Sequence, residues 1–161
     1  MQLDYAILCQ AASSQQGFMN ILGGGVANVF LPSVPGPMFN VAVAINVWME
    51  REEFTRPHTV DIRFIDEDGR PIPNFPNPPQ IAFPAQNPPP PAEPNPHAHH
   101  NLQLVMPLHG VVIHAEGNFA IDILLDNAPA KRIPFRVAHV QMPPGQQPPG
   151  RQPPSPMPRM M

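Results

Sequence analysis

The residues best suited to bind a metal ion lie together in one short segment: His97, His99 and His100. Neutral imidazoles bind zinc, copper or nickel, and three of them within four positions can share one ion if the backbone bends around it. A loop that adds no carboxylate or cysteine ligand would hold the ion weakly. These histidines are the candidate metal site, for zinc or another divalent transition metal, and a solvated polar loop is the alternative interpretation.

Nucleophilic catalysis is the second chemistry to consider. Cys9 is the only cysteine, and a reactive thiolate needs a nearby base or positive charge. The residue instead falls on the apolar side of a predicted strand, where a buried thiol is inert. No serine has the Gly-x-Ser-x-Gly setting of a hydrolase nucleophile. We therefore predict no catalytic residue and no resident cofactor, and we expect that the chain is not an enzyme.

Two further motifs have simple structural interpretations. Gly23, Gly24 and Gly25 separate two apolar runs, but no Gly-Lys-Ser/Thr follows them as a phosphate-binding loop requires, so they predict a tight corner or bulge. The segment 66–70 contains three acidic residues and an Asp-Gly pair at the end of a strand. It predicts a turn, with calcium binding as the alternative.

The charge pattern excludes several classes of partner. The formal net charge is −3, charged residues make up 13% of the chain, and Lys131 is the only lysine. A nucleic-acid footprint needs clustered Lys and Arg, and a basic membrane-binding patch needs the same. We expect neither partner. Since no secretory leader pattern or long apolar span is visible, we expect a soluble, cytoplasmic protein.

The elements that would position these residues are strands. Apolar and polar residues alternate with a period of two in several segments, which is typical of half-buried strands, and no segment has a convincing helical period. The segment 39–50 contains the longest apolar run of the chain, 41–48, which is interrupted only by Asn46 and is rich in β-branched residues; this favours a central strand with Trp48 in the core. The proline in the last strand, Pro134, indicates a sheet edge. The predicted strands are 3–9, 39–50, 59–65, 81–83, 102–106, 110–114, 118–125 and 133–137.

Prolines define the remaining segments. The chain has 27 prolines, and they cluster in 71–96 and in the last twenty residues, where proline excludes helix interiors and central strands. We predict one domain over residues 1–141, with a Pro- and His-rich loop at 85–101, followed by a disordered tail at 142–161. The fold prediction is all-β: a single antiparallel sandwich, immunoglobulin-like or C2-like, of seven to eight strands. A closed barrel is the alternative.

Two segments carry a family resemblance. The strand 3–9 is followed by Asn-Ile-Leu-Gly-Gly-Gly at 20–25, and Glu116-Gly117-Asn118-Phe119 leads into a closing hairpin. This combination resembles a family of bacterial proteins of unknown function that form small β-sandwich domains, over most of residues 2–138. The resemblance implies a fold but no activity, cofactor or site residue.

Three functional hypotheses follow. The first is a non-catalytic binding or assembly module that pairs with a protein partner or a second copy through an open sheet edge. The second is a metal- or small-ligand-binding protein that uses the loop ending at His100. The third is recruitment of a proline-binding domain by the tail, where residues 153–156 fit a Pro-x-x-Pro motif.

Overall fold

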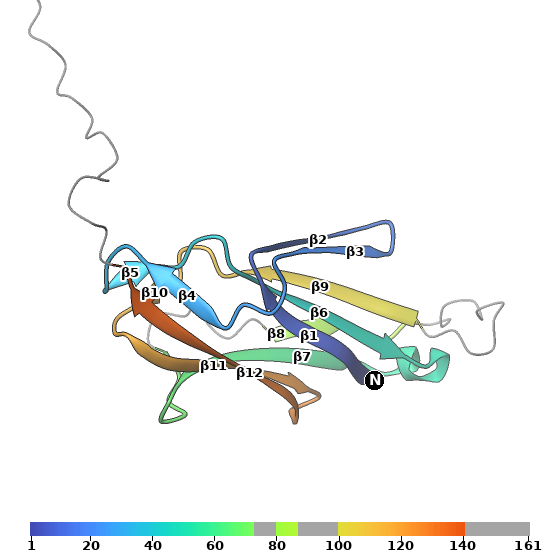
Figure 1. Cartoon of the computed structure of the whole chain (residues 1–161). Helices are drawn as coiled ribbons and strands as arrows, with labels where there is room; N and C mark the ends of the chain where they lie inside the picture. The colour runs from blue at the N-terminus through green and yellow to red at the C-terminus, as the bar shows by residue number, and fades with distance from the viewer. Residues whose placement is uncertain (73–79, 87–99, 141–161) are drawn as a thin grey trace, which may run out of the picture.

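The computed structural model describes residues 1–72, 80–86 and 100–140, which form twelve strands and one turn of 3-10 helix (Figure 1). The predicted tail at 142–161 and most of the predicted loop at 85–101 lie outside these residues. The elements are β1 (Gln2–Cys9), β2 (Ala11–Gln15), β3 (Phe18–Leu22), β4 (Asn28–Leu31), β5 (Gly36–Pro37), β6 (Ala42–Met49), η1 (Arg51–Thr55), β7 (His58–Asp66), β8 (Gln80–Phe83), β9 (His100–Pro107), β10 (Val112–Ile113), β11 (Gly117–Leu125) and β12 (Ala128–His139).

Two sheets pack against each other as a sandwich. One has three strands in the order β1-β6-β9, and the other has five in the order β4-β12-β11-β7-β8. Every neighbouring pair in these sheets is antiparallel except β4 and β12, which run parallel. The predicted all-β sandwich is confirmed, and its two packed sheets together contain eight strands, within the seven to eight expected; β2, β3, β5 and β10 form two further two-stranded sheets.

The core lies between the two sheets and follows from the period of two in the strands. On the five-stranded sheet, Val60, Ile62 and Phe64 of β7 and Ile121 and Ile123 of β11 point inward and are buried. The period of two that predicts half-buried strands at 59–65 and 118–125 is therefore confirmed. The three-stranded sheet contributes Ala6, Leu8, Val43, Ile45, Val47 and Met49.

The hairpin formed by β2 and β3 adds a third layer over part of the three-stranded sheet (Figure 1). Ala12 and Met19 of the hairpin pack on Cys9, Ala42 and Ala44, which lie on the side of the sheet away from the core. Polar contacts fix the end of the hairpin over β9, because the Gln103 side chain accepts a hydrogen bond from Ser14 at 2.8 Å and donates one to the Gly17 carbonyl at 2.9 Å. The hairpin therefore buries the first part of the second side of β6, at Ala42 and Ala44.

Two expectations are wrong in detail. Trp48 is half-buried rather than part of the core, because Val47 and Met49 occupy the inward positions of β6 and the residue between them points the other way. The strand containing Pro134 is not an edge strand, although β4 pairs only with residues 136–139 of it, so Pro134 has a neighbour on one side alone.

Candidate functional site

The structure does not bring the candidate metal ligands together within its described part. His97 and His99 lie outside the described residues, so the predicted metal site stays a prediction. His100 begins β9, and its ring meets the edge of Phe54 with the ring centroids 5.2 Å apart. Among residues 1–72, 80–86 and 100–140, no three His, Cys, Asp or Glu side chains are placed to hold a metal ion.

Cys9 is held in the interior. Its side chain is fully buried, and the thiol donates a hydrogen bond to the Ala42 carbonyl, with 3.3 Å between Sγ and the oxygen. Burial raises the pKa of the Cys9 thiol, because a thiolate loses its hydration in an apolar surrounding. These observations favour the inert thiol expected from the sequence.

The two loop motifs have structural roles. Gly23 and Gly25 have positive φ angles of 60° and 84°, and the Gly25 amide donates to the Leu8 carbonyl at 2.9 Å. That amide is therefore used inside the corner and does not point at a ligand. In the acidic turn, Asp66 Oδ1 accepts hydrogen bonds from the amides of Asp68 and Arg70 at 3.0 and 2.8 Å, which is the geometry of a side-chain-stabilised turn.

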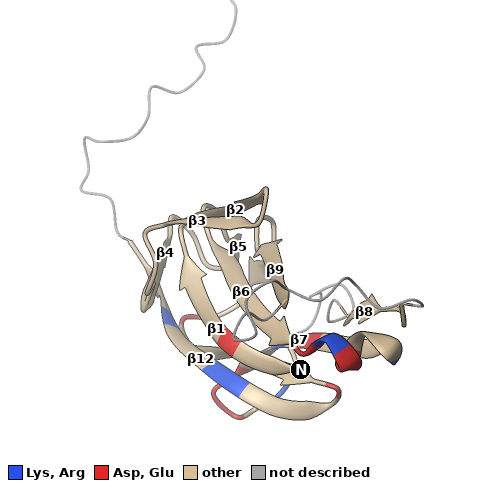
Figure 2. Ribbon diagram, turned by 90° about the vertical axis from the view of Figure 1, so that its right-hand side faces the viewer, with Lys and Arg blue, Asp and Glu red and all other residues tan. Residues whose placement is uncertain are grey.

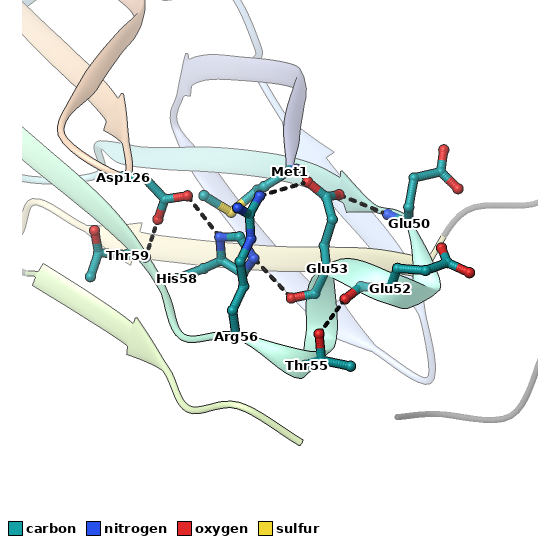
Figure 3. Close-up of polar contacts among 9 residues, drawn as sticks. All are labelled: Met1, Glu50, Glu52, Glu53, Thr55, Arg56, His58, Thr59 and Asp126. Atoms are coloured by element: carbon teal, nitrogen blue, oxygen red, sulfur yellow. Dashed lines mark hydrogen bonds and ion pairs between the residues drawn. The ribbon is translucent and has the colours of Figure 1, made fainter. Parts of the chain in front are cut away.

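A polar cluster joins elements that are far apart in the sequence (Figure 3). His58, at the start of β7, is only 1% exposed. Its Nδ1 lies 2.7 Å from Asp126 Oδ2, and its Nε2 lies 2.9 Å from the Glu53 carbonyl oxygen. Both partner atoms are oxygens that can only accept, so both bonds form together only when the ring carries two protons. The cluster thus connects η1, β7 and the turn between β11 and β12.

Further contacts stabilise both carboxylates of this cluster. Asp126 Oδ1 accepts the Thr59 amide at 2.8 Å. Burial alone would raise the pKa of Asp126, but the hydrogen bonds from Thr59 and His58 and the charges of His58 and Arg56 lower it below its usual value. The Glu53 carboxylate pairs with the amino group of Met1 and accepts the Glu50 amide at 2.9 Å.

The His58–Asp126 pair is therefore structural and not a catalytic dyad. In hydrolases that use such a pair, the second imidazole nitrogen faces a nucleophile and the substrate. Here Nε2 is bonded to the backbone of Glu53 and the ring is closed off from solvent. Proton transfer to a substrate is thus not available at this position.

One end of the sandwich contains no charged residues and is the candidate binding surface. Residues 5–49 contain no Asp, Glu, Lys, Arg or His. In Figure 2, the ribbon of β2, β3, β4 and β5 is tan throughout, so these strands contain no Lys, Arg, Asp or Glu, whereas the blue and red positions lie on other parts of the chain, such as β12 and β1. On the neighbouring strand β12, the charged residue that pairs with β4 is Arg136, which lies opposite Asn28.

Large apolar side chains are exposed at this same end. Phe18 is 73% exposed, Leu22 66% and Phe30 65%, and Ile21 and Phe39 are also open to solvent. We call these five residues the uncharged surface. Single exposed apolar residues are common, but a group of them without charges between them marks an interaction site.

A groove runs through this surface beside β4. It has a volume of about 500 Å³, and the residues lining it include Leu22, Val26, Asn28, Phe30, Phe39 and Val41. A second, shallower hollow on the β2–β3 hairpin shares Leu22 and also contacts Ile21. The exposed apolar residues near β4 therefore belong to two adjoining depressions rather than to isolated points.

Sequence reasoning missed this site because its signal is an absence. The groups searched for were charged, nucleophilic or metal-binding side chains, and the long segment 5–49 contains none of the charged ones. That absence is visible in the printed sequence and would have pointed to an interface, since interface centres are depleted of charge and enriched in aromatic residues and methionine.

Comparison with known proteins supplies the family. A family described as "Family of unknown function (DUF6941)" matches residues 4–138. The chain therefore belongs to this family. This confirms that the chain resembles a family of unknown function, and that the resemblance covers most of residues 2–138. No curated protein matches the chain. In the described residues, no helix has the length and apolar character needed to cross a membrane.

Proposed function

We propose that this chain is a non-catalytic binding or assembly module, and that it binds protein through the uncharged surface. The single observation that carries the proposal is the combination of five exposed large apolar side chains with a chain segment that contains no formal charge. Burying one Leu or Phe side chain contributes about 1.5–3 kcal/mol, so a partner that covers Leu22, Phe30 and Phe39 gains a substantial driving force.

The partner's chemistry follows from the same surface. A charged side chain buried here would lose its hydration without meeting an opposite charge, which is costly. The partner is therefore a protein surface or segment that is itself uncharged and apolar at its centre. The residues that line the two depressions include no Lys, Arg or His, so an anionic ligand such as nucleic acid or a phospholipid headgroup would find no cation there. We further propose, from the sequence, a bacterial origin and a cytoplasmic location.

Affinity capture with three full-length baits tests the proposal. The baits are the wild type, Leu22→Glu and the matched control Ala130→Glu, which adds the same charge at an exposed position of β12 outside the uncharged surface. We expect the wild type and the control to retain the same protein in stoichiometric amounts, this chain or another one, and Leu22→Glu to lose it. Retention of nothing by any bait, or equal retention by all three, contradicts the proposal.

A further inference from the structure

We propose that the partner is a second copy of this chain, and that two copies join edge to edge through β4 across a two-fold axis. This inference rests on the proposed function and names the partner at the same site. It is argued from the hydrogen bonding of β4, from the charges around it and from its register.

The outer edge of β4 offers unpaired backbone groups. In the part of the chain that the structure describes, this strand is the last one in its sheet and pairs with β12 alone, on its inner side. The carbonyls of Ala27 and Leu31 accept the amides of Arg136 and Val140 at 2.9 and 3.0 Å. Because backbone groups in a strand alternate in direction, residues 27, 29 and 31 bond to β12, and the N–H and C=O groups of Asn28 and Phe30 point outward.

The residues of β4 themselves carry none of the usual protections against pairing. Edge strands are commonly protected by a lysine, a bulge, an inward-pointing charge or a cover of other chain segments. β4 reads Asn-Val-Phe-Leu, with alternating exposure, no charge and a regular register with β12. The proline at position 32 follows the strand and does not interrupt it.

The charge distribution fits a copy of the same chain. At a two-fold interface, each residue near the axis lies close to its own equivalent, so any charge there repels itself. The uncharged surface avoids this repulsion. The nearest charge, Arg136, lies one strand in from the edge on β12. Its equivalent would be three strand spacings away, about 14 Å, which exceeds the screening length of about 8 Å at physiological salt.

The outward groups also fix the register. In an antiparallel pair centred on Val29, Asn28 of each copy faces Phe30 of the second copy, and both pairs exchange two backbone hydrogen bonds. Val29 then faces its equivalent in a non-bonded position. A register centred on Phe30 would place Asn28 opposite Pro32, which has no amide to donate. The centre at Val29 is therefore favoured, and it makes one continuous ten-stranded sheet from two five-stranded ones.

Sedimentation equilibrium of the purified full-length chain tests the inference. The wild type and Ala130→Glu are expected to show the same concentration-dependent dimer. Phe30→Glu is expected to weaken dimerisation by about a hundredfold or more, because both exposed rings leave the interface and two like charges enter it. Far-ultraviolet circular dichroism checks that each variant keeps its strands.

A cysteine pairing experiment tests the register. Asn28→Cys and Phe30→Cys proteins, mixed under mild oxidation, are expected to form the mixed disulfide in preference to either homodisulfide, because the facing Cα atoms are about 5.5 Å apart and the diagonal ones are farther. A monomer at all concentrations, an unchanged dimer in Phe30→Glu or preference for a homodisulfide overturns the inference. If the wild type is monomeric but retains another protein that Leu22→Glu loses, this inference fails and the proposed function stands.

Discussion

Replacing His58 with alanine removes a side chain that forms hydrogen bonds at both ring nitrogens in a closed environment. The bond to the Asp126 carboxylate is 2.7 Å long and the bond to the Glu53 carbonyl is 2.9 Å long. A hydrogen bond to a charged group contributes about 1.5–3 kcal/mol and a neutral one about 0.5–1.5 kcal/mol. We therefore expect His58→Ala to lower the free energy of unfolding by about 2–4.5 kcal/mol, before any cost of the cavity it leaves.

Asp126→Asn is the matched control for this experiment. An asparagine keeps an oxygen for the Thr59 amide and can donate to Nδ1 of a neutral His58, which still donates from Nε2 to Glu53. Position 126 also has a positive φ of 50°, which asparagine tolerates well. We expect this variant to lose about 1–1.5 kcal/mol at neutral pH, less than His58→Ala, because the charged hydrogen bond to His58 is replaced by a neutral one and is not lost.

Urea unfolding followed by tryptophan fluorescence measures both variants, because Trp48 is the only tryptophan and lies half-buried on β6. Equal losses in the two variants, or a loss under about 1 kcal/mol for His58→Ala, would refute the claim that this cluster stabilises the fold through His58.

Three further predictions concern pH, reactivity and packing. The pKa of Asp126 is lower in the folded chain than its usual value near 3.9. The ionised Asp126 side chain therefore stabilises the fold above about pH 3.9, and this stabilisation is lost as the pH falls through the pKa of the folded chain. Between about pH 5 and pH 2, the free energy of unfolding should fall more for the wild type than for Asp126→Asn. Cys9 should react with a thiol reagent only at the rate of unfolding, because the thiol is buried and its pKa is raised, and fast labelling in the native state would contradict its placement. Ile121→Ala should destabilise the fold by about 2–5 kcal/mol in the same urea assay, since this side chain is fully buried between the sheets, whereas a loss under about 1 kcal/mol would place it outside the core.

Strands with a strong apolar pattern could be predicted from the sequence. β7 and β11 alternate because one side packs on the core and the other faces outward. β6 is apolar except for Asn46, because the opposite sheet covers one side of the strand and the β2–β3 hairpin covers Ala42 and Ala44 on the other. In contrast, β2 was missed. Its sequence, Ala-Ala-Ser-Ser-Gln, has no large apolar residue, and it is a strand because it pairs with β3.

The environment of a site residue could be predicted only where it depends on residues next to it in the sequence. The inert environment of Cys9 was evident from its position in a strand. The partner of His58 was not, because Asp126 lies 68 positions away and only the fold brings the two together. The uncharged surface likewise combines the β2–β3 hairpin with Phe30 and Phe39, and no local motif links these segments.

The central claim is that the uncharged surface is a protein-binding interface, and Leu22 is the residue that tests it most directly. The side chain is 66% exposed and lines both depressions of the surface, so its replacement by glutamate changes binding without disturbing the core. The decisive measurement is quantitative capture by wild-type, Leu22→Glu and Ala130→Glu baits at equal expression. The account predicts one stoichiometric partner that is lost only with Leu22→Glu. A partner retained equally by all three baits would contradict it.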